Sequence, residues 1–464
     1  MDYNKKTKIV VTIGPSTWDP TVMKNMIESG MNVARVNGAF ADREELEKVS
    51  KLVRDVSDRV SLMIDVKGPQ IRLNKFAEEK HLNIGDPVII GSSDKDEIYP
   101  LSYPDLYKYL KAGQRIIVGD GDTELIIKEI KDGQMHCEVT YGNVLKPAKG
   151  ITIPNAEYGA TTLTEKDKEN IKHCIDLNWD FVSASFIRSA AAAKEVRAVM
   201  GDKMKLIAKI ENQQGVDNID EILPEVDGIM IGRGDLGLQL GLEKVPMVQR
   251  MLIRKCNEAG KPVITATQMF ESMISNPRPT RGEVNDVATA ILLRTDAIML
   301  SAETTTGEYP VEAVKYMTKI ATEIEPQIEP QIVKYKAHST NSTDALTKAA
   351  AELCINSEDE ISKVIVVSKS GTTARLLGRH SIKQPIYAFV SSDFYMRTLM
   401  LSKGIFNAFV QEETHTDRDA AIKSIVEKSL KEGFVNKGEK VLLICKTPFG
   451  GGEYFPNIFE VINI

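Results

Sequence analysis

Short apolar runs rich in β-branched residues alternate with segments of helical period from the start of the chain. The first three runs cover residues 8–13, 31–36 and 61–66. Between the second and third runs, Asp42 followed three residues later by Glu45 has the pattern of a capped helix start, and apolar residues then recur at spacings of three and four. This alternation predicts parallel strands joined by crossover helices.

The alternation stops after residue 68 and resumes at Thr164, which is predicted to cap a helix. Residues 70–155 show short β-rich runs separated by glycine and aspartate turns, without a helical period, which predicts a small all-β insertion. Further strands are predicted at residues 180–187, 204–211, 227–232, 262–267 and 296–301. Three strands before the insertion and five after it make eight strand–helix units, the number that closes a (β/α)8 TIM barrel. An open doubly wound sheet is the alternative, but it does not require eight strands.

A tandem Glu-Pro-Gln-Ile repeat at residues 325–332 interrupts this pattern and is predicted to begin a linker. Another α/β unit follows, with strands predicted near residues 363–368, 385–390, 405–410 and 440–445. The predicted domains are a barrel of residues 1–68 and 156–328, an inserted β domain of residues 69–155, and a C-terminal α/β domain of residues 340–464.

Composition excludes several classes of function. The chain carries 59 Lys plus Arg against 65 Asp plus Glu, a net charge of −6, which removes a general electrostatic attraction to nucleic acid or anionic membranes. No run approaches the roughly 20 apolar residues of a membrane helix, and the first residues lack a signal-peptide core, so a cytoplasmic protein is expected. The 5 cysteines and 6 histidines are scattered, which argues against a disulfide framework and against zinc.

Candidate chemistry lies at the carboxyl ends of the predicted strands, where a barrel of this type carries its reacting groups. Lys209 and Glu211 end one strand and, being two residues apart, share a face. Charged groups in a buried strand are costly unless they are paired or used. These two side chains are therefore either an internal ion pair or part of a site.

Asp235 follows the next strand within a Gly-x-Gly-x-x-Gly sequence at residues 232–237. A dinucleotide-binding interpretation is disfavoured, because a helical pattern is predicted only from about Glu243 and the strand at 263–267 has no terminal acidic residue to hold a ribose. We interpret the segment as a glycine-lined strand end whose amides approach a ligand, with Asp235 as a second carboxylate for a hard cation.

The remaining predicted strand ends are also polar. They carry Arg35 and Asn37, Asp65 and Lys67, Thr265 to Gln268, and Ser301 to Thr304. Together with Arg72, Lys209, Glu211 and Asp235, these groups would converge on one barrel mouth. Cations beside carboxylates suit a phosphorylated or carboxylated substrate bridged to a divalent ion. Each polar strand end could be a structural hydrogen bond, but their coincidence on one rim favours a site.

Several segments of the sequence resemble the motifs of pyruvate kinases. The matching segments are residues 7–15, 31–37, 65–72, 185–188, 208–212, 233–237, 266–273 and 277–281. The matches continue in order to about residue 315 and more weakly to the end. The family has a barrel with a β lid inserted after the third strand and a C-terminal α/β domain. The resemblance implies that residues 69–155 form a β-barrel lid, that residues 340–464 form an effector or assembly domain, and that the chain is a homotetramer.

The resemblance also implies an activity, the transfer of a phosphoryl group from phosphoenolpyruvate to ADP, which gives pyruvate and ATP in the last step of glycolysis. Lys209 would stabilise the phosphoryl group in flight, and Arg35 would bind the substrate phosphate. Amides around Gly234 and the Thr267 hydroxyl would hold the substrate carboxylate. Ser301 would belong to the relay that protonates the enolate.

Cofactor and nucleotide contacts are carried over in the same way. Glu211 and Asp235 would hold Mg²⁺ or Mn²⁺. The nucleotide contacts would be Asn37, Arg72 and Lys149, and a site for a monovalent cation such as potassium would use Asn37, Asp65 and Val66. The sequence departs from the family at Gly38-Ala39-Phe40, where most members have Phe-Ser-His, and at Gln70, where most have Glu. The lost hydroxyl and carboxylate predict a weak or absent dependence on potassium.

In the predicted C-terminal domain, a strand runs into a loop rich in hydroxyls that precedes a helix. The loop comprises Ser368, Lys369, Ser370, Gly371, Thr372 and Thr373. A loop of this kind before a helix amino terminus can hold a phosphate, and it resembles the effector loop of regulated pyruvate kinases. A phosphorylated effector is the prediction, and a capped helix with a solvated turn is the alternative. Gly450 to Gly452 lies where the family has a flexible closing loop.

Two other functions compete with the kinase. A Mg²⁺-dependent lyase or aldolase acting on a pyruvate enolate could use Glu211 and Asp235 in the same way, but it would not need the β insertion or Arg72. A metabolite-sensing regulator with an inactive barrel would be expected to lack Lys209, Glu211 or Asp235, and all three are present.

Overall fold

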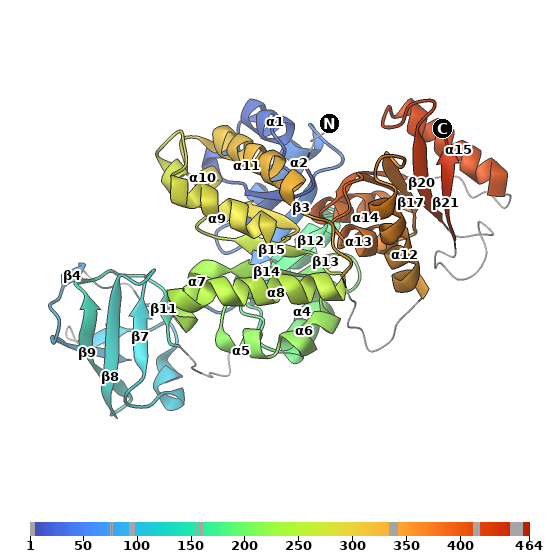
Figure 1. The fold of residues 1–464 in the computed structure, drawn as a ribbon. Coiled ribbons are helices and arrows are strands. Elements are labelled where there is room, and N and C mark those ends of the chain that lie inside the picture. Colours follow the sequence, from blue (N-terminus) through green and yellow to red (C-terminus); the bar gives the residue numbers. More distant parts are fainter. Residues whose placement is uncertain are drawn as a thin grey trace.

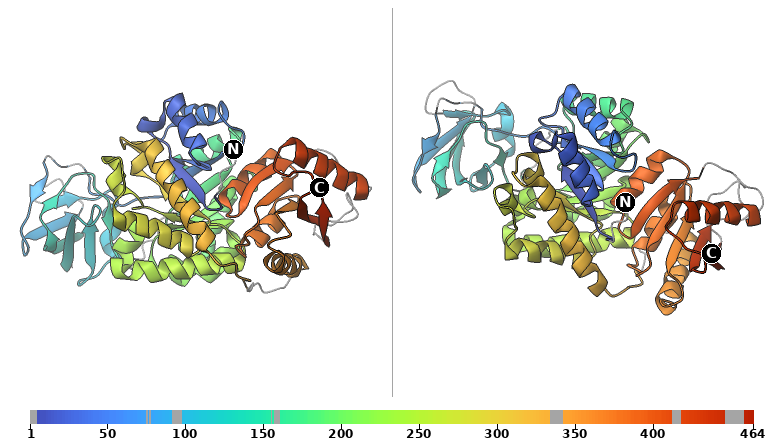
Figure 2. Two further views of the ribbon diagram at one scale, coloured as in Figure 1. Left: turned by 45° about the horizontal axis from the view of Figure 1, so that its top comes forward. Right: turned by 90° about the horizontal axis from the view of Figure 1, so that it is seen from above.

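The computed structural model describes residues 5–74, 76, 78–91, 98–154, 156, 161–333, 342–411, 418–445 and 458–464. Eight parallel strands close into a barrel in the order β1-β16-β15-β14-β13-β12-β3-β2. Figure 1 shows this barrel at the centre of the molecule, with the β-rich insertion on one side and the C-terminal domain on the other, and both views in Figure 2 show the same arrangement. The predicted (β/α)8 fold is confirmed, and the open doubly wound sheet is excluded.

The barrel strands lie close to their predicted positions. They are β1 (Lys8–Thr12), β2 (Val33–Asn37), β3 (Ser61–Val66), β12 (Phe181–Ala184), β13 (Lys205–Ile210), β14 (Gly228–Gly232), β15 (Val263–Ala266) and β16 (Ala297–Leu300). The surrounding helices are α1 (Pro20–Glu28), α2 (Arg43–Arg54), α3 (Glu165–Asp176), α4 (Ala190–Met200), α5 (Gln213–Asp217), α6 (Ile219–Glu225), α7 (Arg233–Leu240), α8 (Val245–Ala259), α9 (Arg281–Leu292), α10 (Ala302–Thr305) and α11 (Pro310–Ile324).

Side-chain caps start several of these helices where the sequence predicts them. The Asp42 carboxylate accepts a hydrogen bond of 2.9 Å from the Glu45 amide at the start of α2. At the start of α3, Thr164 and Asp167 form a reciprocal capping box, because each side chain accepts from the other residue's backbone N–H. These caps satisfy backbone donors that the first helical turn would otherwise leave unpaired.

In its described residues, the insertion consists of short strands and one 3-10 helix, η2 (Pro104–Tyr109), which the sequence pattern missed. The strands are β4 (Lys80–His81), β5 (Pro87–Gly91), β6 (Ile98–Pro100), β7 (Arg115–Val118), β8 (Thr123–Lys131), β9 (Gln134–Gly142), β10 (Val144–Leu145) and β11 (Ile151–Thr152). Six of them form the sheet β11-β7-β8-β9-β5-β6.

The segment of residues 71–74 connects the two edges of the six-stranded sheet. Near β11, Arg72 forms a bridge to Gly150, and the Leu73 amide donates to the Lys149 carbonyl at 2.9 Å. Near β6, Leu73 forms a bridge to Leu101, and the Asn74 amide donates to the Pro100 carbonyl at 2.7 Å. Because the bridges involve only Arg72 and Leu73, this segment joins the edges of the sheet without forming a strand of its own. The two edges are therefore linked through residues 71–74, and the β-barrel form of the lid stays a prediction.

The C-terminal domain has a five-stranded sheet in the order β19-β18-β17-β20-β21. Its elements are α12 (Ser342–Asn356), β17 (Lys363–Val367), α13 (Thr372–Gly378), β18 (Ile386–Val390), α14 (Asp393–Thr398), β19 (Ile405–Val410), α15 (Arg418–Lys431), β20 (Lys440–Cys445) and β21 (Ile458–Asn463). The sequence pattern missed β21, which is the antiparallel edge strand.

The C-terminal domain packs against the amino-terminal end of the barrel. Leu401 belongs to the cluster of apolar residues that fills the barrel interior, and the fully buried Asp180 of the barrel pairs with Arg397 at 2.7 Å. Glu325, in the segment predicted to begin a linker, is also buried and accepts hydrogen bonds from the backbone N–H groups of Lys6 and Thr7. The segment is therefore anchored to the barrel at its start. None of the helices in the described part of the chain is long and apolar enough to cross a membrane.

Candidate active site

Inward-facing residues at the carboxyl ends of the barrel strands form a charged layer above an apolar one. The apolar layer includes Val33, Met63 and Ile207. Two residues further along the same strands stand Arg35, Asp65 and Lys209. Because side chains alternate between the two faces of a strand, these three charged groups point into the mouth of the barrel directly above the apolar interior.

The charged groups form one buried network. Arg35 Nη2 lies 2.9 Å from Asp65 Oδ2, and Lys209 Nζ lies 3.4 Å from Asp65 Oδ1 and 3.0 Å from Glu211 Oε1. The side chains of Asp65 and Glu211 are 2% exposed and that of Lys209 is 11% exposed. Charges this deep interact far more strongly than charges in water, so the network holds its members in fixed positions.

Hydroxyl and amide groups orient this network. Thr12 Oγ1 accepts from Arg35 Nη1 at 2.8 Å, Ser183 Oγ donates to Asp65 Oδ2 at 3.0 Å, and Ser185 Oγ accepts from Lys209 Nζ at 2.8 Å. The Phe186 amide donates to Glu211 Oε2 at 3.0 Å, and Phe186 has a φ of 53°. Sequence reasoning gave none of these four residues a role. Period-2 alternation along strands β1 and β12 is the signal that places Thr12 and Ser183 on the inward face.

The network shifts the pKa values of its members. Burial raises the pKa of Glu211 to about 7, with the neighbouring Asp235 adding to the rise and Lys209 opposing it. Burial would lower the pKa of Lys209, but Asp65 and Glu211 outweigh it and hold the pKa above its ordinary value. Burial would raise the pKa of Asp65, but Arg35 and Lys209 keep it below its ordinary value. Lys209 and Asp65 are therefore charged at neutral pH, and Glu211 titrates near it.

A second group of predicted residues lies where β14 meets α7. The Gly234 amide donates to Thr267 Oγ1 at 2.9 Å, and Asp235 lies in the first turn of α7. The helix begins at Arg233 and not near Glu243 as predicted, because its contacts in the folded protein override the weak helical propensity of its glycines. A helix amino terminus favours negative charge, which suits this position for a substrate carboxylate.

A cavity of about 310 Å³ opens between this barrel mouth and the insertion. Its lining includes Lys67 and Asp235 from the barrel rim and Gln70 and Ile151 from the insertion. Burial lowers the pKa of Lys67, while Asp235 opposes that shift. The structure thus brings Arg35, Asp65, Lys67, Lys209, Glu211 and Asp235 to one mouth, in agreement with the convergence that the strand ends predict.

The predicted nucleotide contacts lie at the edge of this arrangement. Arg72 donates from Nη1 to the Ala148 carbonyl at 3.1 Å and from Nη2 to Gln70 Oε1, and it acts electrostatically on Lys67. Lys149 pairs with Asp122 at 3.5 Å and with Asp120 at 3.9 Å, both within the insertion. The structure therefore places Arg72 beside the mouth, and Lys149 on the insertion among acidic partners.

Two further predicted residues, Asn37 and Ser301, are held by hydrogen bonds between a side chain and a backbone amide. Asn37 Oδ1 accepts from the Ala39 amide at 3.2 Å. The Ser301 amide donates to Glu303 Oε2 at 2.6 Å, and the buried Glu303 also accepts from the Phe270 amide at 3.0 Å. Glu303 therefore fixes the loop that carries Ser301, a function that the polar strand end alone does not reveal.

Among the described residues, no group of three or more His, Cys, Asp or Glu side chains is arranged to hold a metal ion. Glu211 and Asp235 remain a pair of carboxylates that act on each other electrostatically at the mouth. Mg²⁺ is commonly bound through one or two carboxylates, with water and substrate oxygens completing its octahedron. The two carboxylates fit such an ion, and they do not form an all-protein cage.

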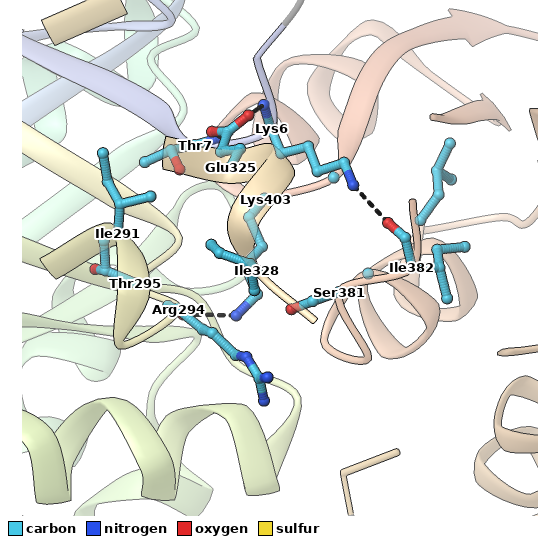
Figure 3. Close-up of a pocket in the computed structure, with 13 residues that line it drawn as sticks. Lys6, Thr7, Ile291, Arg294, Thr295, Glu325, Ile328, Ser381, Ile382 and Lys403 are labelled. Atoms are coloured by element: carbon cyan, nitrogen blue, oxygen red, sulfur yellow. Dashed lines mark hydrogen bonds between the residues drawn. The ribbon is translucent and has the colours of Figure 1, made fainter. Parts of the chain in front are cut away.

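A small cavity at the opposite end of the barrel is not a second site. Figure 3 shows Lys6, Thr7, Glu325 and Lys403 around it. Its volume is about 30 Å³, which is the space of a single water molecule. Lys403 Nζ donates hydrogen bonds to Asn257 Oδ1 and to the Arg294 carbonyl, each at 2.5 Å. This cavity lies within the packing between the barrel and the C-terminal domain.

Comparisons with known proteins agree with this fold. Residues 4–314 match the family model described as pyruvate kinase, barrel domain, and residues 344–462 match pyruvate kinase, alpha/beta domain. A pyruvate kinase of Sporosarcina psychrophila is 38% identical over 96% of this chain and 78% of its own length, and one of Clostridium acetobutylicum is 37% identical over 96% of both chains. The crystal structure of a pyruvate kinase from Cryptosporidium parvum superposes with a TM-score of 0.91, at 28% identity, over 99% of this chain and 96% of that one.

Proposed function

This chain belongs to the pyruvate kinase family, and we propose on that premise that it transfers the phosphoryl group of phosphoenolpyruvate to ADP, giving pyruvate and ATP in glycolysis. The observation that carries the proposal is the buried Arg35–Asp65–Lys209–Glu211 network at the barrel mouth. It places two cations and two carboxylates beside a cavity that the insertion helps to line. Such a mixture suits a phosphorylated substrate and a divalent cation together.

The proposed roles follow from where each group lies. The Lys209 ammonium is fixed by Ser185, Asp65 and Glu211, so it can stabilise charge that spreads over the phosphoryl oxygens without having to reorganise. Arg35 would bind the substrate phosphate. The Gly234 amide and the Thr267 hydroxyl, which lie 2.9 Å apart, would hold the carboxylate at the amino terminus of α7.

The remaining roles concern the enolate, the metal and the nucleotide. Ser301 would belong to the relay that delivers a proton to carbon. Glu211 and Asp235 would hold Mg²⁺ or Mn²⁺, which neutralises charge on the phosphoryl oxygens when bound. Asn37, Arg72 and Lys149 would contact ADP, and closure of the insertion over the nucleotide would exclude water.

A coupled assay tests the function directly. The purified chain is mixed with phosphoenolpyruvate, ADP and Mg²⁺, and pyruvate is measured with lactate dehydrogenase and NADH. Formation of pyruvate that depends on ADP supports the kinase. Turnover of a pyruvate enolate that does not need ADP would favour a lyase or aldolase, and binding of phosphoenolpyruvate without turnover would favour a regulator. We also infer that the chain acts in the cytoplasm as a homotetramer, as its relationship to the family suggests.

Potassium dependence is expected to be weak. The proposed monovalent site keeps Asn37, Asp65 and Val66, but it lacks a hydroxyl at Ala39 and a carboxylate at Gln70. Fewer oxygen ligands and less negative charge weaken the attraction for a cation. We expect turnover in tetramethylammonium buffer to stay within about threefold of turnover in potassium, since one ligand contact contributes on the order of 1 kcal/mol. An enzyme that is inactive until potassium is added would contradict this expectation.

A matched variant sharpens the potassium test. Gln70→Glu restores the missing negative charge, so it should increase the stimulation by potassium relative to tetramethylammonium. Equal stimulation of the parent and the variant would show that residue 70 does not govern the cation requirement.

We further propose that a phosphorylated effector binds the loop of residues 368–373. Ser370 Oγ and Thr372 Oγ1 lie 2.9 Å apart on its exposed side, and Arg375 Nη2 donates to Thr372 Oγ1 at 3.0 Å. Thr373, in contrast, is buried, so the exposed hydroxyls are the better candidates for contact. The glycines at 450–452 lie outside the described residues.

The effector proposal predicts a change in apparent affinity for phosphoenolpyruvate. Sugar phosphates and nucleoside monophosphates are titrated at subsaturating substrate, with the parent beside Lys369→Ala and Thr372→Ala. We expect one of these ligands to change the apparent affinity of the parent by about tenfold, a typical allosteric coupling, and the variants to lose most of that response. If no phosphate changes the affinity of the parent, the domain has a structural or assembly function.

A further inference from the structure

A buried arginine lies behind the loop that carries Thr267. Arg233, the first residue of α7, is 7% exposed. Its Nε donates to the Ala266 carbonyl at 3.1 Å and to the Thr267 carbonyl at 3.2 Å. Its Nη2 donates to the Thr267 carbonyl at 2.6 Å and to the Gln268 carbonyl at 3.0 Å. One guanidinium therefore holds three consecutive carbonyls.

The backbone that these carbonyls belong to is strained. Thr267 has a φ of 67° and Gln268 a φ of 51°, which places two consecutive non-glycine residues in the left-handed region. Such residues persist only where the surroundings determine their conformation. Thr267 is also β-branched, which makes the left-handed conformation less favourable for it than for most residues.

The guanidinium is itself fixed by the helices around it. Arg233 Nη1 lies 2.7 Å from Asp286 Oδ2 on α9 and donates to Gln249 Oε1 on α8 at 3.4 Å. The planar fork of an arginine can serve carbonyls and a carboxylate at once, whereas the single ammonium of a lysine cannot. The position of the loop is thus tied to α7, α8 and α9 through one side chain.

The strained conformation determines where the Thr267 hydroxyl lies. Thr267 Oγ1 donates to the Ala266 carbonyl at 2.6 Å and accepts from the Gly234 amide at 2.9 Å. Gly234 directly follows Arg233, so one segment supplies the amide in front of the hydroxyl and the guanidinium behind its backbone. A relaxed loop would move the hydroxyl away from the amino terminus of α7.

We propose that Arg233 is a positioning residue, whose guanidinium stabilises the left-handed turn at Thr267 and Gln268 and thereby holds the Thr267 hydroxyl in place for the substrate carboxylate. The inference rests on the proposed function for the identity of the substrate. It does not rest on that function for the behaviour of the loop. Arg233 touches no reacting atom and acts through Thr267.

Steady-state kinetics test the proposal with Arg233→Lys, which keeps a cation for Asp286 but cannot hold three carbonyls. We expect kcat/KM for phosphoenolpyruvate to fall about 30-fold while KM for ADP stays within twofold. Adding Gln268→Gly should recover at least fivefold of that loss, because glycine adopts a positive φ without strain. Recovery by a substitution that adds no contact is not expected if Arg233 only stabilises the protein as a whole.

A double-mutant cycle shows whether Arg233 acts through Thr267. In a Thr267→Ala background, Arg233→Lys should cost less than threefold, because the hydroxyl that it positions is absent. Additive losses, or no rescue by Gln268→Gly, would overturn the proposal. Hydrogen–deuterium exchange of the peptide covering residues 266–270 gives a readout that is independent of turnover. We expect exchange at least tenfold faster in Arg233→Lys than in the parent, and unchanged exchange would also overturn it.

The two proposals can fail separately. A parent protein that makes no pyruvate from phosphoenolpyruvate and ADP would refute the proposed function, and the exchange measurement would still decide the positioning of the loop. An active parent with additive losses would refute the positioning alone.

Discussion

Replacing Lys209 with methionine is expected to lower kcat by about a thousandfold while the protein stays folded. Methionine keeps most of the length and apolar volume of the lysine stem but removes the ammonium. Removing one fixed group that stabilises transition-state charge typically costs 10²–10³ in rate, and more where a cation faces a phosphoryl group in transfer. A thousandfold loss corresponds to about 4 kcal/mol of activation free energy.

Lys205→Met is the matched control, because it is the same substitution on the same strand. Lys205 begins β13 at the other end of the barrel and pairs with Asp227 at 3.1 Å. It should therefore leave kcat within about twofold. KM for phosphoenolpyruvate in Lys209→Met should change far less than kcat, since the lysine is assigned to the transition state. A variant with near-normal turnover would show that the role of Lys209 is wrong.

Strand periodicity explains why the barrel and its charged mouth could be predicted from the sequence. Each strand is short, apolar and buried, and the alternation of faces places Arg35, Asp65 and Lys209 above the apolar interior. The strand boundaries alone were enough to identify these three groups. The TIM-barrel rule that reacting groups stand at the carboxyl ends then identified the mouth.

What the sequence could not show depends on contacts between distant segments. The helix α7 begins with Arg-Gly-Asp-Leu-Gly, whose glycines have low helical propensity. It is held by Arg233, whose partners Gln249, Thr267 and Asp286 lie 16 to 53 residues away. The positive φ of Thr267 and Gln268 could not be predicted from the sequence either, because neither threonine nor glutamine is typical of the left-handed region. Local patterns locate the strand ends, and tertiary packing decides how the loops beyond them are held.

Replacing Glu211 with glutamine is expected to weaken Mg²⁺ or Mn²⁺ binding by one to two orders of magnitude and to lower turnover accordingly. Glutamine keeps the shape of the side chain and an acceptor oxygen but loses the negative charge that a hard cation requires. Mn²⁺ binding can be followed by electron paramagnetic resonance without substrates, so the metal affinity is separated from catalysis. The matched control is Glu221→Gln, a change in an exposed side chain on the outer helix α6, which should leave both quantities unchanged.

The pH dependence of metal binding tests the same residue independently. Burial raises the pKa of Glu211 to about 7 in the metal-free protein, so below pH 7 the carboxyl group holds a proton that must leave before the ion binds. Affinity for Mn²⁺ should therefore fall by up to tenfold for each pH unit below about 7 and change little above it. In Glu211→Gln no such proton exists, so the affinity should be low and nearly flat between pH 6 and 8. A parent whose affinity is flat across this range, or a variant that keeps the slope, would mean that another group controls access to the metal.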